Sequence, residues 1–164
     1  MSAGRPFFVV SDVHLGAVSA NTERAFRAFL RYAGESAAGL VINGDLFDVW
    51  IPSRRFVLRP YVRVLAQLAE LVDQGLPVYF VGGNHDALEY SETVLREDIG
   101  IRVLGDPARI DLHCKGLHLW LEHRSGGRRL MGIVPRGSSA PFRQPRSAVS
   151  IASDTSDIAS GLVR

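Results

Sequence analysis

Three short apolar runs, separated by amphipathic segments, constrain the fold of this chain more than any other feature of its sequence. The runs cover residues 6–11, 40–43 and 76–81. Each is continuous rather than alternating, which is typical of strands that are covered on both faces. Because these strands alternate with helical segments, the pattern predicts an α/β fold with parallel pairing and right-handed crossovers.

The two segments between these runs have the periodicity of helices that pack by one face. We expect the first helix from Asn21, as its N-cap, to about Glu35. The second is expected to begin near Pro60, which the first turn of a helix tolerates, and to end at Gly75. Their apolar stripes comprise Phe26, Phe29, Leu30 and Ala33, and then Val62, Leu65, Leu68, Ala69 and Val72. The opening of the chain is therefore predicted to be β-α-β-α-β.

The pattern changes after residue 90. Ser91 is expected to cap a short helix that ends near Asp98, and a short strand is expected over residues 101–104. Residues 109–114 and 117–123 alternate in polarity on either side of Lys-Gly, which predicts a hairpin.

Polar side chains that bind metals follow each of the three apolar runs. They are Asp12 and His14 after the first run, Asp45 and Asp48 after the second, and Asn84, His85 and Asp86 after the third. The loops at the carboxyl ends of strands form the binding crevice of open α/β sheets. Carboxylate, imidazole and amide groups suit Mn, Fe or Zn, and two such ions about 3.5–4 Å apart can clamp a phosphoryl transfer. Each residue alone has an ordinary role at a strand end or a turn, but their joint occurrence predicts one shared site.

The motifs D-x-H, G-D-x-x-D and G-N-H-D, in this order, resemble the calcineurin-like metallophosphoesterases over about residues 6–123. The resemblance implies the N-terminal part of a sandwich of two β-sheets flanked by helices, with an irregular tail behind it. It implies two divalent ions, with Mn foremost and Fe or Zn as alternatives, and hydrolysis of a phosphate ester or nucleotide pyrophosphate by a hydroxide that the ions activate. The implied roles are first-ion ligands for Asp12 and His14, a bridging ligand for Asp45, a second-ion ligand for Asn84, catalysis for His85, orientation of His85 for Asp86, and support for Asp48.

A narrower resemblance comes from the stretch GDLFDVW at residues 44–50. It is similar to the bacterial UDP-2,3-diacylglucosamine diphosphatases, which act in lipid A synthesis. Two features depart from that group. Residues 51–55 read Ile-Pro-Ser-Arg-Arg where glycine and acidic residues usually follow, and His85 stands where many of those enzymes have arginine.

The histidines that complete the family's site are present only in part. The family adds one histidine in a His-Gly-Asp-like segment and two in a Gly-His-x-His segment. His123 falls where the first is expected, although Arg124 and Ser125 follow it, and no histidine comes after it in this sequence. We expect His123 to be either a metal ligand or an ordinary strand-end residue. By resemblance, each ion would lack one ligand.

Residues 124–164 differ in composition from the rest. They hold seven arginines, no lysine and two acids, which leaves 12 of the 19 basic and 15 of the 17 acidic residues before them. The segment is rich in serine, glycine and proline, so it cannot bury enough apolar surface to offset the entropy of ordering it. We expect an incomplete phosphoesterase domain over residues 1–123 and a disordered tail over 124–164. A reading-frame change near codon 124 would produce such a tail, which the nucleotide sequence of the gene would test.

Composition limits the remaining possibilities. A length of 164 residues suggests one domain, and a net charge of +2 is too small to indicate a nucleic-acid partner. The single Cys114 cannot form an internal disulfide, as in a reducing cytoplasm. No apolar run has the length of a membrane helix or signal peptide, so a cytoplasmic location is expected, peripheral to a membrane if the substrate is a lipid precursor. An exposed sheet edge would favour a homo-oligomer.

Three functions stay open at this point. The chain is a working phosphoesterase, a catalytically impaired remnant that binds metal weakly, or a non-catalytic nucleotide-binding module. The missing histidines favour the second over the first. The third is disfavoured because the sequence has no glycine-rich phosphate loop of the G-x-G-x-x-G or P-loop type.

Overall fold

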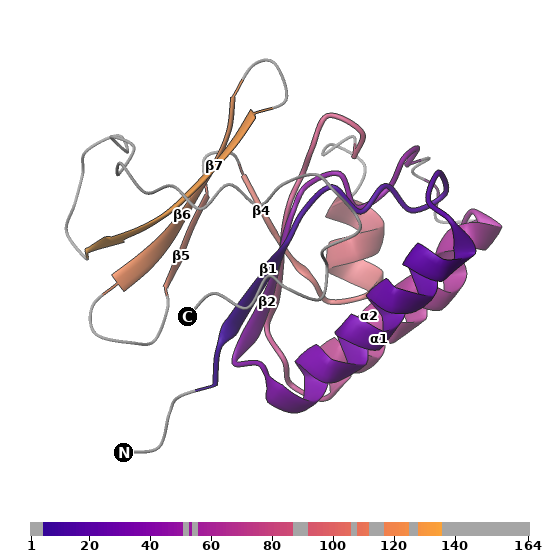
Figure 1. Cartoon of the computed structure of the whole chain (residues 1–164), viewed down its shortest axis with the longest axis horizontal. Helices are drawn as coiled ribbons and strands as arrows, with labels where there is room; N and C mark the ends of the chain where they lie inside the picture. The colour runs from indigo at the N-terminus through magenta and orange to yellow at the C-terminus, as the bar shows by residue number, and fades with distance from the viewer. Residues whose placement is uncertain are drawn as a thin grey trace.

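A four-stranded parallel sheet lies between a layer of helices and a second, antiparallel sheet (Figure 1). The computed structural model describes residues 5–50, 53, 56–86, 92–105, 108–111, 117–124 and 128–135. The parallel sheet has the order β1-β2-β3-β4, formed by Phe7–Val10, Gly39–Asn43, Val78–Val81 and Arg102–Leu104. The second sheet has the order β5-β6-β7, formed by Ala108–Asp111, Leu117–Arg124 and Arg128–Pro135. The predicted parallel α/β arrangement and hairpin are confirmed.

Alternation along the buried strands creates two cores. Side chains of successive strand residues point to opposite faces. On β2, Leu40 and Ile42 pack in the core beneath the helices, whereas Val41 packs with Ile110 and Leu121 of the second sheet. Both faces of the parallel sheet are therefore covered, which explains the continuous apolar runs.

Helix α1 (Ala20–Ser36) begins earlier than its predicted N-cap. Ser19 has extended backbone angles, and its hydroxyl oxygen accepts the N–H of Thr22 at 3.2 Å. Asn21 is already helical, and its side-chain oxygen accepts a hydrogen bond from the Arg24 guanidinium. The cap is thus Ser19 and not Asn21, because the N-cap residue must leave the helical conformation while its side chain accepts a hydrogen bond from the first turn. The predicted stripe is confirmed, with Phe26, Leu30 and Ala33 buried and Phe29 packed against the core.

Helix α2 (Val62–Asp73) follows a short 3₁₀ turn, η1 (Arg59–Tyr61), and its last turn leads to Gly75 at φ 86°. This helix forms where it is predicted, and Leu65 and Leu68 of the predicted stripe are buried, but the buried face is rotated relative to the predicted one. Its buried residues are Val64, Leu65, Gln67, Leu68 and Leu71, while Ala69 and Val72 are half-buried and Val62 is 50% exposed. Gln67 turns inward because its amide donates to the Arg27 carbonyl of α1 at 2.9 Å. Contact with α1 therefore set the helix rotation that periodicity alone placed differently.

The segment before β4 forms η2 (Glu92–Asp98), which has π-helical hydrogen bonding. Its predicted cap, Ser91, and the Lys-Gly turn of the predicted hairpin, at residues 115–116, lie outside the described residues. Among the residues that are described, no helix combines the length and apolarity needed to cross a membrane.

Strand β7 corrects the predicted start of the irregular tail. It lies within residues 124–164 and pairs antiparallel with β6, from Leu117 opposite Pro135 to Arg124 opposite Arg128. The composition of the whole tail concealed a short apolar run at residues 130–134, and such a run can use the backbone groups of β6 as partners. Residues 136–164 lie outside the described part. The predicted homo-oligomer stays a prediction, for which β1 is a candidate edge because β2 is its only partner among the described strands.

Candidate metal centre

The loops that follow β1 and β2 are joined along their backbones. The N–H of Asp12 donates to the carbonyl oxygen of Gly44 at 3.1 Å, and the N–H of His14 donates to that of Asp45 at 3.0 Å. Parallel strands end at the same edge of the sheet, so their loops can continue the pairing past the strands. The first two predicted motifs therefore form one unit.

Three predicted ligands have strained backbones. The φ angles of Asp12, His14 and Asp45 are 54°, 47° and 49°, and no other described non-glycine residue has a positive φ. This left-handed conformation costs roughly 1–2 kcal/mol per residue for an L-amino acid. Strain of this kind clusters at functional sites, where the surrounding structure holds it in place. The strain therefore marks this edge of the sheet independently of side-chain chemistry.

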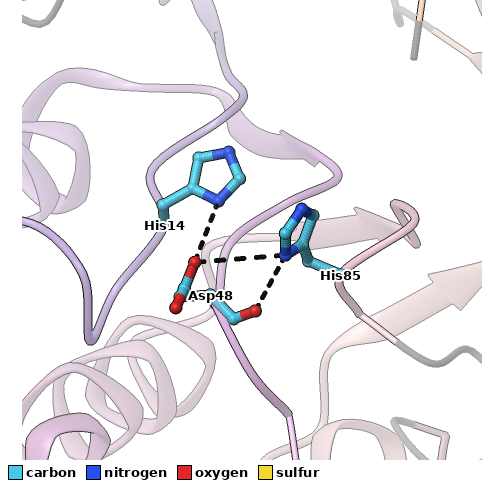
Figure 2. A group of neighbouring side chains, drawn as sticks. All are labelled: His14, Asp48 and His85. Atoms are coloured by element: carbon cyan, nitrogen blue, oxygen red, sulfur yellow. Dashed lines mark hydrogen bonds and ion pairs between the residues drawn. The ribbon is translucent and has the colours of Figure 1, made fainter. Parts of the chain in front are cut away.

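The side chains form two groups that share one imidazole. Ligand atoms of Asp12, His14 and Asp45 lie within 4.8 Å of one another, and so do those of His14, Asp48 and His85. Figure 2 shows the second group, with the Asp48 carboxylate facing both imidazoles. Two carboxylates with an imidazole in the first group, and two imidazoles with a carboxylate in the second, suit hard to borderline divalent ions such as Mn, Fe or Zn. The residues present therefore fit the metal ions expected from the sequence.

Asp48 belongs to the second group of potential metal ligands, whereas the sequence predicts only a supporting role for it. Its Oδ1 is 3.8 Å from Nδ1 of His14 and 4.0 Å from Nδ1 of His85. At these distances the carboxylate acts on both rings through its charge rather than through a short hydrogen bond. The two rings meet edge to face, with their centroids 4.9 Å apart.

The main chain of Asp48 orients His85. Nδ1 of His85 lies 2.8 Å from the Asp48 carbonyl oxygen (Figure 2). A carbonyl oxygen can only accept, so Nδ1 must carry a proton, and Nε2 is the nitrogen left for chemistry. This hydrogen bond raises the pKa of His85, with smaller contributions in the same direction from nearby carboxylates, whereas desolvation lowers it.

The predicted role of Asp86 in orienting His85 stays a prediction, and the hydrogen bonds of its carboxylate go to backbone amides. Its carboxylate is fully buried, where Oδ1 accepts the N–H of Phe47 at 3.0 Å and Oδ2 accepts those of Leu46 and Gly83 at 3.2 Å each. Burial raises the pKa of Asp86, and the three amide hydrogen bonds act in the opposite direction. The carboxylate ties the loop after β3 to the loop after β2.

Two further predicted ligands stay predictions. Asn84 is exposed, and it precedes His85, whose N–H donates to Oδ1 of Asp45 at 3.1 Å. That contact brings the G-N-H-D loop to the predicted bridging residue. His123 lies on β6 opposite Arg129, and its side chain lies outside what the structure describes.

One residue that no sequence motif marks also contacts this region. Tyr61 of η1 is buried, and its hydroxyl donates to the Val49 carbonyl oxygen at 2.6 Å. No motif marks this tyrosine, and its place next to Pro60 at the start of a helix was the only local signal.

Comparison with known proteins gives a consistent result. The profile of the family described as "Calcineurin-like phosphoesterase" matches residues 5–131. A UDP-2,3-diacylglucosamine hydrolase of Stenotrophomonas maltophilia (strain K279a) is 38% identical over 119 residues, which are 70% of this chain and 44% of that protein. The protein of the same name from Porphyromonas gingivalis is 34% identical over 100 residues, covering 58% of this chain and 37% of that protein. The one from Shewanella piezotolerans is 33% identical over 104 residues, covering 63% and 42%. The chain thus spans about two fifths of the length of these curated relatives.

Proposed function

Since this chain belongs to the calcineurin-like phosphoesterase family, we propose that it hydrolyses phosphoric ester or anhydride bonds with the help of divalent metal ions. One observation carries the proposal. The three described non-glycine residues with left-handed backbones are Asp12, His14 and Asp45, and their ligand atoms lie together beside His85. Backbone strain at three potential ligands is typical of a functional site.

The proposal assigns the metal ligands as follows. Asp12, His14 and Asp45 would hold one ion, and Asp45 together with Asn84 would contribute to holding a second. Asp48 faces both imidazoles and adds negative charge that favours a cation there. When bound, such ions lower the pKa of a water molecule and neutralise charge on phosphoryl oxygens. Mn is the proposed ion, because oxygen-rich donor sets suit it and the site has a majority of oxygen ligands.

His85 is proposed to act directly on the phosphoryl group or the leaving oxygen. Its Nδ1–H is held by the Asp48 carbonyl, so the ring presents Nε2. A protonated Nε2 can stabilise negative charge on a phosphoryl oxygen, or donate its proton to the departing oxygen. The hydrogen bond to the Asp48 carbonyl raises the pKa of His85.

The proposed substrate is a nucleotide pyrophosphate of the UDP-2,3-diacylglucosamine type. Support comes from relatives that carry the name UDP-2,3-diacylglucosamine hydrolase and from the GDLFDVW stretch. Residues 44–48 of that stretch supply Asp45 and Asp48 to the metal centre. A simpler phosphodiester or phosphomonoester remains the broader form of the same proposal.

Hydrolysis of bis(p-nitrophenyl) phosphate with Mn²⁺ tests the proposal. We expect turnover by the wild-type protein and a loss of at least about 100-fold in Asp45→Asn. Asp73→Asn is the matched control, because Asp73 is an exposed acid at the end of α2. No turnover by the wild-type protein, or equal turnover by Asp45→Asn, would contradict the proposal and favour an impaired remnant.

A further inference from the structure

We infer that Tyr61 is a positioning residue that fixes the Asp48–Val49 peptide group, and through this peptide fixes the imidazole of His85. The effect on hydrolysis rests on the proposed function, whereas the positioning itself depends only on the contacts described below.

The hydroxyl of Tyr61 contacts both main-chain polar groups of Val49. It donates to the Val49 carbonyl oxygen at 2.6 Å, and it accepts the Val49 N–H at a longer distance of 3.4 Å. The Val49 side chain is 53% exposed, so packing of that side chain does not hold the residue in place. The tyrosine hydroxyl therefore supplies the anchor that the valine side chain does not.

One peptide group connects Tyr61 to His85. The N–H of Val49 and the carbonyl of Asp48 belong to the same planar peptide, and in a trans peptide they point in opposite directions. Tyr61 accepts from the N–H side, and Nδ1 of His85 donates to the carbonyl side at 2.8 Å. Hydrogen bonds in such a chain polarise and strengthen one another. A rotation of this peptide would move the carbonyl away from the imidazole.

The ring of Tyr61 is itself firmly held. It is 2% exposed, with its centroid 4.7 Å from that of Phe47 and 6.1 Å from that of Trp50. These two aromatic residues flank the Asp48–Val49 peptide in the chain, and they stack on each other at 4.2 Å. Burial raises the pKa of Tyr61 above its ordinary value of 10.0, so the hydroxyl keeps the proton that it donates.

The loop that carries His14 also meets this hydroxyl. Gly16 has φ 104°, and a Cβ placed on it would lie 2.9 Å from the Tyr61 hydroxyl oxygen. The carbonyl oxygen of the neighbouring Leu15 accepts a hydrogen bond from the N–H of Asp48 at 2.9 Å. The close approach therefore requires glycine, and the hydroxyl lies where the loops after β1 and β2 meet.

The test compares Tyr61→Phe with Tyr79→Phe. Both variants remove the hydroxyl of a buried tyrosine, but the Tyr79 residue packs between the two sheets, and its hydroxyl accepts from the guanidinium of the exposed Arg102 at 3.0 Å. The first readout is the ¹⁵N NMR spectrum of the histidine rings, with the His85 signals assigned from a His85→Gln variant. We expect the Nδ1–H form of His85 to lose population in Tyr61→Phe and to stay as in wild type in Tyr79→Phe.

Kinetics supply the second readout. With bis(p-nitrophenyl) phosphate and Mn²⁺, we expect kcat of Tyr61→Phe to fall about 3- to 10-fold, as for loss of one hydrogen bond, with KM changed less than about twofold. Gly16→Ala should alter the His85 signals in the same direction, and it provides a second variant if Tyr61→Phe folds poorly. An unchanged His85 ring spectrum in Tyr61→Phe, or an equal change in Tyr79→Phe, would overturn the inference. If the wild-type protein shows no hydrolysis, the proposed function fails, and the NMR comparison still decides the positioning role.

Discussion

Nδ1 of His85 lies 2.8 Å from the carbonyl oxygen of Asp48, although 37 positions separate the two residues in the chain. This contact joins the loop after β3 to the loop after β2, and it engages Nδ1 rather than Nε2 of the ring. The residue next to His85, Asp86, strengthens the same junction by accepting three backbone N–H groups. These adjacent residues thus make different contacts, His85 with one carbonyl oxygen and Asp86 with three backbone amides.

The proposed catalytic role predicts that His85→Gln lowers kcat roughly 100-fold while metal affinity changes little, because the ring is proposed to act on the phosphoryl group rather than on the ions. Activity and Mn²⁺ titration by calorimetry would measure the two quantities. His118→Gln, on β6, is a control that removes a histidine from the second sheet. A loss of Mn²⁺ binding in His85→Gln would show that His85 is a ligand instead.

The proposed bridging role of Asp45 predicts that Asp45→Ala abolishes metal binding at both positions. Its Oδ1 already accepts the N–H of His85, so this carboxylate lies between the first ligand group and the loop of Asn84. Elemental analysis of the dialysed protein would report the number of ions per chain, with Asp73→Ala as the control. Two ions per chain in Asp45→Ala would count heavily against a bridging role.

The buried carboxylate predicts that Asp86→Asn destabilises the fold. The asparagine NH₂ would face amide donors that now have an acceptor oxygen, leaving at least one buried N–H without a partner. The expected cost is about 1–3 kcal/mol in the free energy of unfolding, measured by urea denaturation of the apoprotein. Unchanged stability, with activity alone reduced, would return Asp86 to the orienting role predicted from the sequence.

The helix cap predicts different costs for two neighbouring substitutions. Ser19→Ala removes the oxygen that accepts the N–H of Thr22 and should destabilise the protein by about 1 kcal/mol. Asn21→Ala removes only an exposed contact with Arg24 and should cost less than about 0.5 kcal/mol. Thermal or urea unfolding of the two variants compares them directly, and the reverse order would restore Asn21 as the cap.

The close packing of the Phe7 ring against Gly39 predicts that Gly39→Ala lowers the free energy of unfolding by about 1–3 kcal/mol through overpacking. A Cβ at Gly39 would lie 2.4 Å from Cε1 of Phe7. Gly105→Ala is the matched control, since no atom lies within 4 Å of a Cβ placed there. Equal unfolding free energies for the two variants would show that Phe7 moves aside without cost.

Much of the fold was predictable because it depends on local pattern. The continuous apolar runs indicated strands covered on both faces, and Leu40, Val41 and Ile42 are buried on both sides of the sheet. Helix rotation was less predictable. The inward position of Gln67 depends on a carbonyl of α1 that periodicity cannot see. Strand β7 was missed because its partner, β6, was needed to make its short apolar run into a strand.

The sequence by itself determined which chemical groups this protein places at the ends of its first three strands, because motif order and strand periodicity are local properties of the chain. Only the tertiary structure decided how those groups are used. It placed Asp48 between two imidazoles, directed Asp86 into the core, and brought Tyr61 to the peptide that holds His85. These contacts join separate loops, and their geometry depends on how the loops pack against one another, which residue identity and spacing do not specify.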